Sequence, residues 1–163
     1  MLYRTYVFLH LVGVVVFFSG FTASLFLKVR AERTGDLKIL AYTFSLINFN
    51  DKWFTPASVL MILGGGFAAA LTSGIPIAGT GWILWSLVLY GLSGLIFVTR
   101  ALPLQQRLER MTKDAPSSVG FDWARYKKAS VSWTRWATTA FLAVVGAFAL
   151  MVFKPGPAAF SWF

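Results

Sequence analysis

Four long apolar stretches, almost free of charged residues, constrain the fold of this chain more than any other feature. They cover about residues 5–27, 56–73, 82–99 and 136–153. Each has about 18 to 23 residues, which in a helix is enough to cross a hydrocarbon core of about 30 Å. The chain is 57% hydrophobic and only 13% charged, whereas soluble domains have about 25% charged residues. We therefore expect an all-α fold, a single domain over residues 1–163 that forms an antiparallel bundle of four transmembrane helices.

Start and stop residues predict where these helices begin and end. Thr55 as an N-cap and Pro56 at the first helical position suit the start of the second helix. Arg100 and Pro103 predict the end of the third helix, and Lys154, followed by proline and glycine, predicts the end of the fourth. The first stretch is longer than the apolar core of a signal peptide, roughly 7 to 15 residues, and its positive charges follow it, so we expect it to be retained.

Residues 28–55 and 100–135 are predicted to be loops between the membrane helices. Apolar residues at helical spacing over residues 37–48 indicate a short amphipathic helix that lies on the membrane surface. Residues 104–113 predict a basic helix, which a break follows. Asp122 is then a candidate N-cap for a helix that continues into the fourth apolar stretch.

The positions of the basic residues predict the orientation in the membrane. Of the 15 Lys and Arg residues, all but Arg4 and Lys154 lie in the segments 28–55 and 100–135. Because cytoplasmic loops are enriched in Lys and Arg, we expect these segments in the cytoplasm, against anionic headgroups, and both termini outside. The expected location is the inner membrane of a bacterium. Tryptophans are expected at the two interfaces: Trp53, Trp133 and Trp136 at the inner one, and Trp82, Trp85 and Trp162 at the outer one.

The composition excludes most classes of enzyme chemistry. The chain has no cysteine and only one histidine, His10, and its six acidic residues all lie in segments 28–55 and 100–135. A catalytic triad, a metal site with several ligands or a carboxylate proton path would need these groups close together. We interpret Asp51, which precedes the second apolar stretch, as a helix cap or as an ion-pair partner of Lys52 or of an arginine. We therefore expect no catalytic residue and no metal site, and since the net charge of +9 flanks membrane helices, no nucleic-acid partner.

Small residues recur at helical spacing within the apolar stretches, and they predict close helix packing. In the first stretch one stripe holds a histidine, two glycines, a phenylalanine and a serine: His10, Gly13, Phe17, Gly20 and Ser24. The other stretches carry glycine and alanine at similar spacing: Gly65, Gly66, Ala69, Ala70, Gly91, Gly94, Ala143 and Ala147. Such stripes let helix backbones approach closely in lipid. They suit contacts within the bundle and contacts with another membrane protein equally well.

His10 is the one candidate for cofactor binding. An ionisable side chain inside a membrane helix is a functional candidate, and imidazole is a common axial ligand of haem iron. The sequence offers Met151 as a sixth ligand, and Arg4 and Lys154 as cations for the propionates. The alternative is a neutral histidine that donates a hydrogen bond to a neighbouring helix or to water.

Several short motifs resemble a family of bacterial predicted integral membrane proteins, domain of unknown function 2269. They are Leu9-His10-Leu11-Val12-Gly13, Asp51 with Phe54-Thr55-Pro56, Trp82, and Pro103-Leu104-Gln105-Gln106-Arg107-Leu108. That family is distantly similar to four-helix membrane proteins of the HemJ and CopD kind, in which a histidine of the first helix is implicated in haem or copper handling. The resemblance carries over only to His10. Proteins of the HemJ kind also use an intramembrane lysine, and no predicted span here contains one, so protoporphyrinogen oxidation is not expected.

Three functions follow as hypotheses. The first is a protein without enzyme chemistry that acts by helix packing, as an accessory or assembly subunit of a larger membrane complex or as a homo-oligomer. The second is a haem b protein with a redox or haem-handling role, in which His10 is the axial ligand. The third is transport of a small solute or of copper, which only four methionines and the absence of charged residues from the middle of the predicted spans make the weakest.

Overall fold

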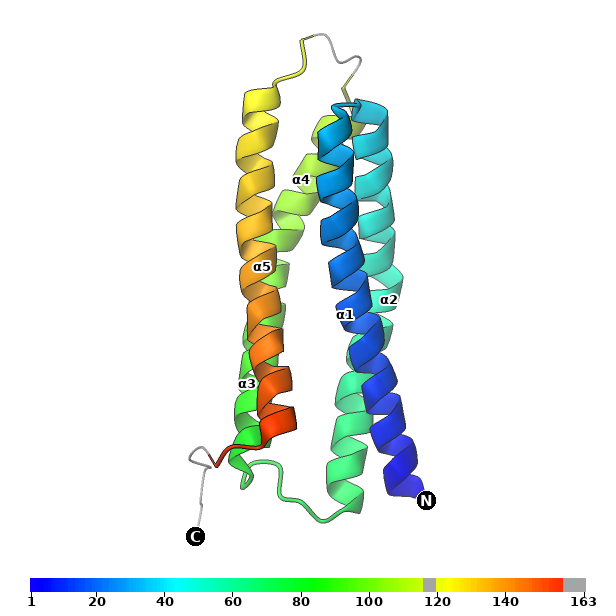
Figure 1. Ribbon diagram of the computed structural model, residues 1–163, viewed down its shortest axis with the longest axis vertical. Helices are drawn as coiled ribbons and strands as arrows, with labels where there is room; N and C mark the ends of the chain where they lie inside the picture. The colour runs from blue at the N-terminus through cyan, green and yellow to red at the C-terminus, as the bar shows by residue number, and fades with distance from the viewer. Residues whose placement is uncertain (116–119, 157–163) are drawn as a thin grey trace.

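A computed structural model describes residues 1–115 and 120–156, and every regular element in them is a helix (Figure 1). The elements are α1 (Leu2–Thr34), α2 (Leu37–Thr72), α3 (Gly81–Ile96), the π-helix η1 (Phe97–Ala101), α4 (Leu102–Lys113) and α5 (Trp123–Phe153). Four continuous helical segments are long and apolar enough to cross a membrane, with α3, η1 and α4 forming one of them. The predicted all-α fold with four spanning helices is confirmed.

The four segments alternate in direction, so the molecule has two distinct ends. The start of α1, the end of α5 and the α2–α3 connection lie at one end, which we call the terminal end (Figure 1). The α1–α2 turn, the end of α4 and the start of α5 lie at the other, which we call the basic end. Gly35, at φ 65°, and Asp36, whose carboxylate accepts from the Lys38 N–H, make the sharp turn between α1 and α2.

The helices are much longer than the sequence predicts. α1 has 33 residues and α2 has 36, so at 1.5 Å per residue each is about 50 Å long, against a hydrocarbon core of about 30 Å. The segments expected to be loops, 28–55 and 100–135, are therefore mostly helical in their described part. They extend the bundle beyond the apolar spans at the basic end.

Two of the predicted helix boundaries are wrong. Residues 37–48 do not form a separate surface helix, because they are the first turns of α2, and Pro56 lies inside α2 rather than at its start. A proline inside a helix removes one backbone hydrogen bond, here the one to the carbonyl of Lys52. The predicted N-cap at Asp122 is confirmed, since its carboxylate accepts from the Arg125 N–H at 2.9 Å.

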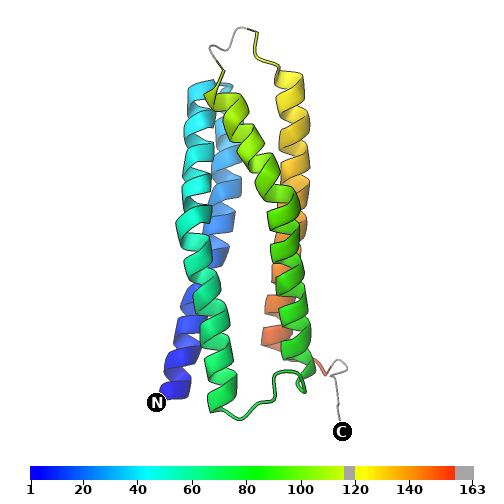
Figure 2. The same ribbon diagram turned by 180° about the vertical axis from the view of Figure 1, so that it is seen from behind.

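The third span also continues where we expected it to end. At Arg100 the chain forms η1 and then enters α4, with Pro103 in the first turn of α4. π-helical turns and prolines both bend helices. Figure 2 shows α4 turned away from the direction of α3 and crossing towards α2. The bend therefore lets one continuous segment pair with α5 at the terminal end and with α2 at the basic end.

The buried core lies at the basic end. Its largest fully buried side chains include Leu40, Phe44 and Ile47 from α2 and Leu108 from α4. Their partners on α5 include Trp133, which is only 2% exposed and therefore is not the interface tryptophan that we expected. The periodic apolar face of residues 37–48 thus covers α4 and α5 instead of lipid.

Four cations lie over tryptophan rings along the bundle. Away from the terminal end the pairs are Lys28 with Trp133, Lys52 with Trp53, and Arg100 with Trp136, at 5.3 to 5.5 Å from cation to ring centroid. At the terminal end Lys154 lies 5.3 Å from the centroid of Trp82. Between Lys52 and the end of α2 the helix runs for about 30 Å at 1.5 Å per residue, which matches a hydrocarbon core. Trp162 lies outside the described residues.

Candidate functional site

His10 is held by a hydrogen bond between two helices. Its Nδ1 lies 2.7 Å from the backbone carbonyl oxygen of Ile62 in α2. A carbonyl can only accept, so in this contact Nδ1 carries the proton, and in the neutral imidazole Nε2 keeps its lone pair. This is the tautomer that histidine ligands of metal ions commonly adopt, with the second nitrogen donating to a carbonyl.

Glycines in α2 make this contact possible. A Cβ at Gly65 would lie 2.7 Å from the His10 backbone nitrogen and 2.8 Å from the Tyr6 carbonyl oxygen, and a Cβ at Gly66 would lie 3.0 Å from His10 Nδ1. Further along α1, a Cβ at Gly13 would also lie within 3 Å of the backbone of α2, and a Cβ at Gly20 would meet the side chain of Asn50. The small-residue stripe of α1 therefore packs within the bundle, against α2.

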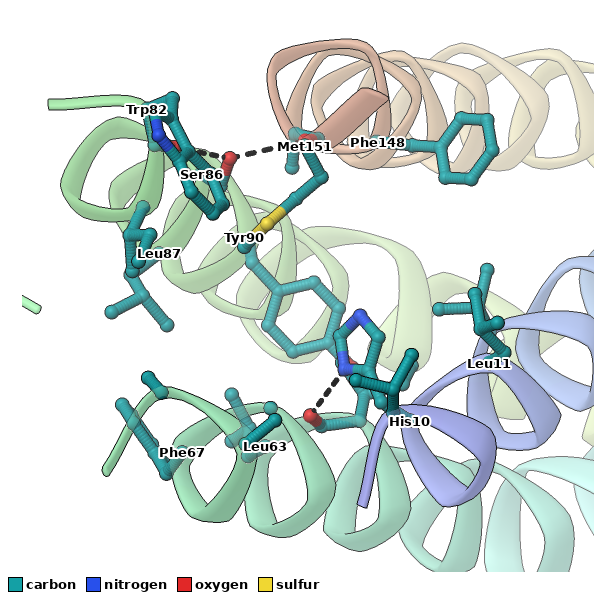
Figure 3. A pocket seen from close by; sticks show the side chains of 18 of the residues that line it. His10, Leu11, Leu63, Phe67, Trp82, Ser86, Leu87, Tyr90, Phe148 and Met151 are labelled. Carbon is teal, nitrogen blue, oxygen red and sulfur yellow. Dashed lines mark hydrogen bonds between the residues drawn. The ribbon is translucent and has the colours of Figure 1, made fainter. Parts of the chain in front are cut away.

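The imidazole faces a pocket between the two helical pairs at the terminal end (Figure 3). The pocket has a volume of about 290 Å³ and is lined by apolar side chains from α1, α2, α3 and α5. Its rim includes Leu11, Phe67, Phe148 and Val152, which are all exposed. Because these residues lie in membrane spans, the pocket opens sideways into lipid on this side, and Ser73 and Lys154 line it at the terminal end.

Few polar groups in the pocket are left to bind a ligand. The hydroxyls of Ser73 and Ser86 donate to backbone carbonyls. The buried hydroxyl of Tyr90, in contrast, has no hydrogen-bond partner among the described residues. Figure 3 shows His10, Tyr90 and Met151 extending into the pocket from α1, α3 and α5. These side chains offer an acceptor, His10 Nε2, a hydroxyl and a thioether, and Tyr3, Trp82 and Lys154 also line the pocket with polar groups.

The structure brings together some of the residues that the sequence predicts for a haem site. Met151 and Lys154 line the same pocket as His10, whereas Arg4 is exposed and does not line it. Tyr90 was not predicted, although a hydroxyl in the middle of an apolar span is a signal that could have found it. No three His, Asp or Glu side chains lie close enough to hold a metal ion in the described part of the chain.

A polar cluster lies at the basic end, far from His10. Gln105 is fully buried, and its side chain accepts from Trp133 Nε1 at 3.1 Å and donates to Asn48 and to Asp51, both at 2.7 Å. Asn48 in turn donates to Glu109 at 2.6 Å. We expected Asp51 to be a helix cap or an ion-pair partner, and among the described residues it is neither. Instead it accepts the hydrogen bond from Gln105 that joins α2 to α4.

A second polar cluster joins α1 to α5 around Glu32. The Lys28 ammonium, which is 3% exposed, lies 3.0 Å from the Glu32 carboxylate and also donates to Thr134. The hydroxyls of Tyr126 and Ser130 donate to the same carboxylate. The ammonium and both hydroxyls of this cluster have acceptors, so the cluster contributes to the packing of α1 on α5.

Comparison with known proteins agrees with the membrane fold. Residues 4–155 match the family DUF2269, described as a predicted integral membrane protein. No curated protein and no solved structure matches the chain, and the likeness to the HemJ and CopD kind stays a prediction. The match covers nearly the whole chain and confirms the family that the short motifs predicted. The chain therefore belongs to the DUF2269 family of predicted integral membrane proteins.

Proposed function

We propose that this protein is a membrane-embedded binding protein that holds haem b in the pocket at the terminal end, with His10 as the axial ligand. One observation carries the proposal. The Ile62 carbonyl fixes the imidazole through Nδ1, which leaves Nε2 directed at an apolar pocket that opens into the lipid. A bound haem would supply one-electron chemistry at its iron.

The residues of the pocket fit a haem in their chemistry. Met151 offers a thioether as a possible sixth ligand, and Lys154 offers one cation for a propionate. The volume of about 290 Å³ is just below the range of ligand pockets, which is about 300–1,000 Å³. Because the rim is open, part of a macrocycle can extend into the bilayer, and the pocket need not enclose it.

The absorption spectrum of the purified protein tests this function. We expect a Soret band in the natural protein after incubation with haem, and its loss in His10→Gln. Glutamine keeps a donor for the Ile62 carbonyl but has no nitrogen that can ligate iron. Met151→Leu serves as the matched variant and is expected to retain haem with a shifted spectrum. An equal Soret band in His10→Gln would show that haem binding, if any, is not at this site.

The unpartnered Tyr90 hydroxyl favours a second candidate ligand, a membrane quinol. Such a ring carries two opposed hydroxyl oxygens, so one can donate to His10 Nε2 and the other can accept from Tyr90. Extraction of the purified protein followed by chromatography measures the bound quinol. Tyr90→Phe is expected to lower the bound quinol and to leave a Soret band unchanged, which separates the two ligands. Equal quinol in natural protein and Tyr90→Phe contradicts this candidate.

The role as an accessory subunit stays a prediction. Many apolar side chains are exposed along the spans, but contact with lipid requires the same surface. The stripe of α1 is already used against α2. Neither feature therefore favours a partner protein over lipid, and transport of a solute or of copper has no further support.

We further infer that the basic end faces the cytoplasm of a bacterial cell, where it meets anionic headgroups. All basic residues except Arg4 and Lys154 lie in the half of the chain that forms this end, and the positive-inside rule then sets the orientation. The chain has no cysteine, so a single introduced cysteine can report on which side of the membrane its position lies. An impermeant maleimide applied to intact spheroplasts is expected to label Ala78→Cys, at the terminal end, and to label Lys113→Cys only after lysis. The reverse pattern would overturn the orientation.

A further inference from the structure

A groove of mixed charge lies between α2 and the bent segment formed by η1 and α4. It has a volume of about 540 Å³, and it is lined by two acids, Asp51 and Glu109, two bases, Lys52 and Arg110, and amide and apolar side chains. Opposite charges this close usually form ion pairs. Yet the only ion pair among the described residues is Lys28 with Glu32, so the charges of the groove are not paired with one another.

The carboxylates have acceptor capacity left inside the groove. Glu109 accepts from Asn48 through Oε2 only, so its Oε1 has no partner in the described structure. Asp51 accepts from Thr55 and Asn50 through Oδ1 and from Gln105 through Oδ2. Because a carboxylate oxygen can accept twice, its remaining capacity is on Oδ2. The groove thus presents carboxylate oxygens that an ammonium group can bind, next to two cations that a phosphate can bind.

The position of the groove along the bundle indicates where its ligand comes from. Lys52 is the last charged residue before the apolar span of α2, and Arg100, in η1, is the first charged residue after the third apolar stretch and lies over the ring of Trp136. These two cations mark the level at which the apolar spans end. The groove begins at this level, with Phe97 and Leu102 lining it beside the charged residues. This is the depth of phospholipid headgroups, where an ammonium, a phosphate and the start of two acyl chains occur in one molecule.

From this geometry we propose that the groove binds the headgroup of a phospholipid that carries a primary ammonium, such as phosphatidylethanolamine. The ammonium lies between Glu109 and Asp51, and the phosphate contacts Lys52 and Arg110. A primary ammonium has three N–H donors, whereas the quaternary ammonium of phosphatidylcholine has none at the same charge. The site therefore distinguishes these two lipids by hydrogen bonds and not by charge.

Native mass spectrometry of the detergent-purified protein tests the site with lipids of identical acyl chains. We expect phosphatidylethanolamine to bind about tenfold more tightly than phosphatidylcholine, as one charge-assisted hydrogen bond allows. Glu109→Gln is expected to abolish this preference, although its amide oxygen can still accept from Asn48. Asp122→Asn is the matched control, because it removes one acid at the same end, outside the groove, and keeps a good N-cap. This control is expected to retain the preference.

Two further binding measurements, with soluble phosphoethanolamine and with phosphatidylglycerol, distinguish other ligands. Soluble phosphoethanolamine has the same charges without acyl chains, and it is expected to bind far more weakly than the lipid. Equal binding of the two lipids, a preference that survives in Glu109→Gln, or equal binding of phosphoethanolamine would each overturn the proposal. So would tightest binding of phosphatidylglycerol that is lost in Lys52→Gln/Arg110→Gln, because the groove would then be a site for anionic headgroups.

Discussion

Gly65→Ala is expected to destabilise the protein by about 3 kcal/mol, near the upper limit for overpacking, whereas Gly64→Ala in the same glycine run leaves it stable. The added Cβ at Gly65 would lie within 3 Å of backbone atoms of Tyr6 and His10. Backbone cannot move aside as a flexible side chain does, so α1 must shift away from α2. At Gly64 nothing lies within 4 Å, and alanine has the higher helix propensity by about 0.8–1.0 kcal/mol.

Thermal unfolding in mild detergent, followed by circular dichroism, measures this difference. We expect Gly65→Ala to lower Tm by roughly 6 to 12 °C, and Gly64→Ala to leave it unchanged or slightly higher. Gly66→Ala is expected to fall between them in stability but to weaken ligand binding, since its Cβ would meet the imidazole of His10. Equal Tm values for Gly64→Ala and Gly65→Ala would mean that α1 and α2 do not pack at this contact.

Glu32→Leu is expected to destabilise the protein by about 3 kcal/mol, the lower limit for breaking a buried ion pair by removing one partner. The carboxylate accepts from Lys28, Tyr126 and Ser130. Its loss leaves a buried ammonium whose remaining contacts are the Thr134 hydroxyl and the Trp133 ring, and it leaves two hydroxyls without this acceptor. The cost therefore comes mainly from groups that stay behind, and not from the strength of the pair itself.

A second substitution separates these contributions. Lys28→Met/Glu32→Leu removes both charges and keeps apolar volume, and such replacements of whole ion pairs are often neutral. We expect the double variant to recover at least half of the Tm that Glu32→Leu loses. The comparison also needs Lys28→Met alone. If the Tm losses of Lys28→Met and Glu32→Leu simply add in the double variant, Lys28 does not depend on Glu32 as its charge partner, contrary to the contact at 3.0 Å.

Hydropathy was sufficient to predict the number of spanning segments, because an uncharged apolar run as long as residues 136–153 favours a helix that crosses the membrane. The N-cap at Asp122 was also predictable, since capping is a local interaction. The continuous course of α2 was not. Asp36 caps a helix that runs through Pro56. The residues around a proline do not determine whether a helix ends there or continues with one hydrogen bond fewer.

The apolar face of residues 37–48 shows a second limit of sequence patterns. Periodicity identifies which side of a helix is buried, but it does not identify what covers that side. Lipid was our expectation, and the structure places Trp133 and Leu108 there. The bend at η1 brings α4 to this face, and the sequence signal for that bend, Pro103, is also what a helix end would show.

Much of the candidate site followed from one unusual residue. His10 was identifiable because an ionisable group is rare in a membrane span. Its partner Ile62 was not, because any backbone carbonyl can accept and only the packing of α1 on α2 selects one. The same packing decides that Met151 lines the pocket and Arg4 does not, a choice that depends on how helices rotate about their axes.

The sideways opening of the pocket determines what sets its occupancy. A ligand that enters between Leu11 and Phe148 comes from the hydrocarbon phase, so its mole fraction among the lipids governs binding, and its aqueous concentration matters only through partitioning. Adding detergent at fixed ligand and protein therefore dilutes the ligand within the micelles and weakens apparent binding, even though no contact in the pocket has changed.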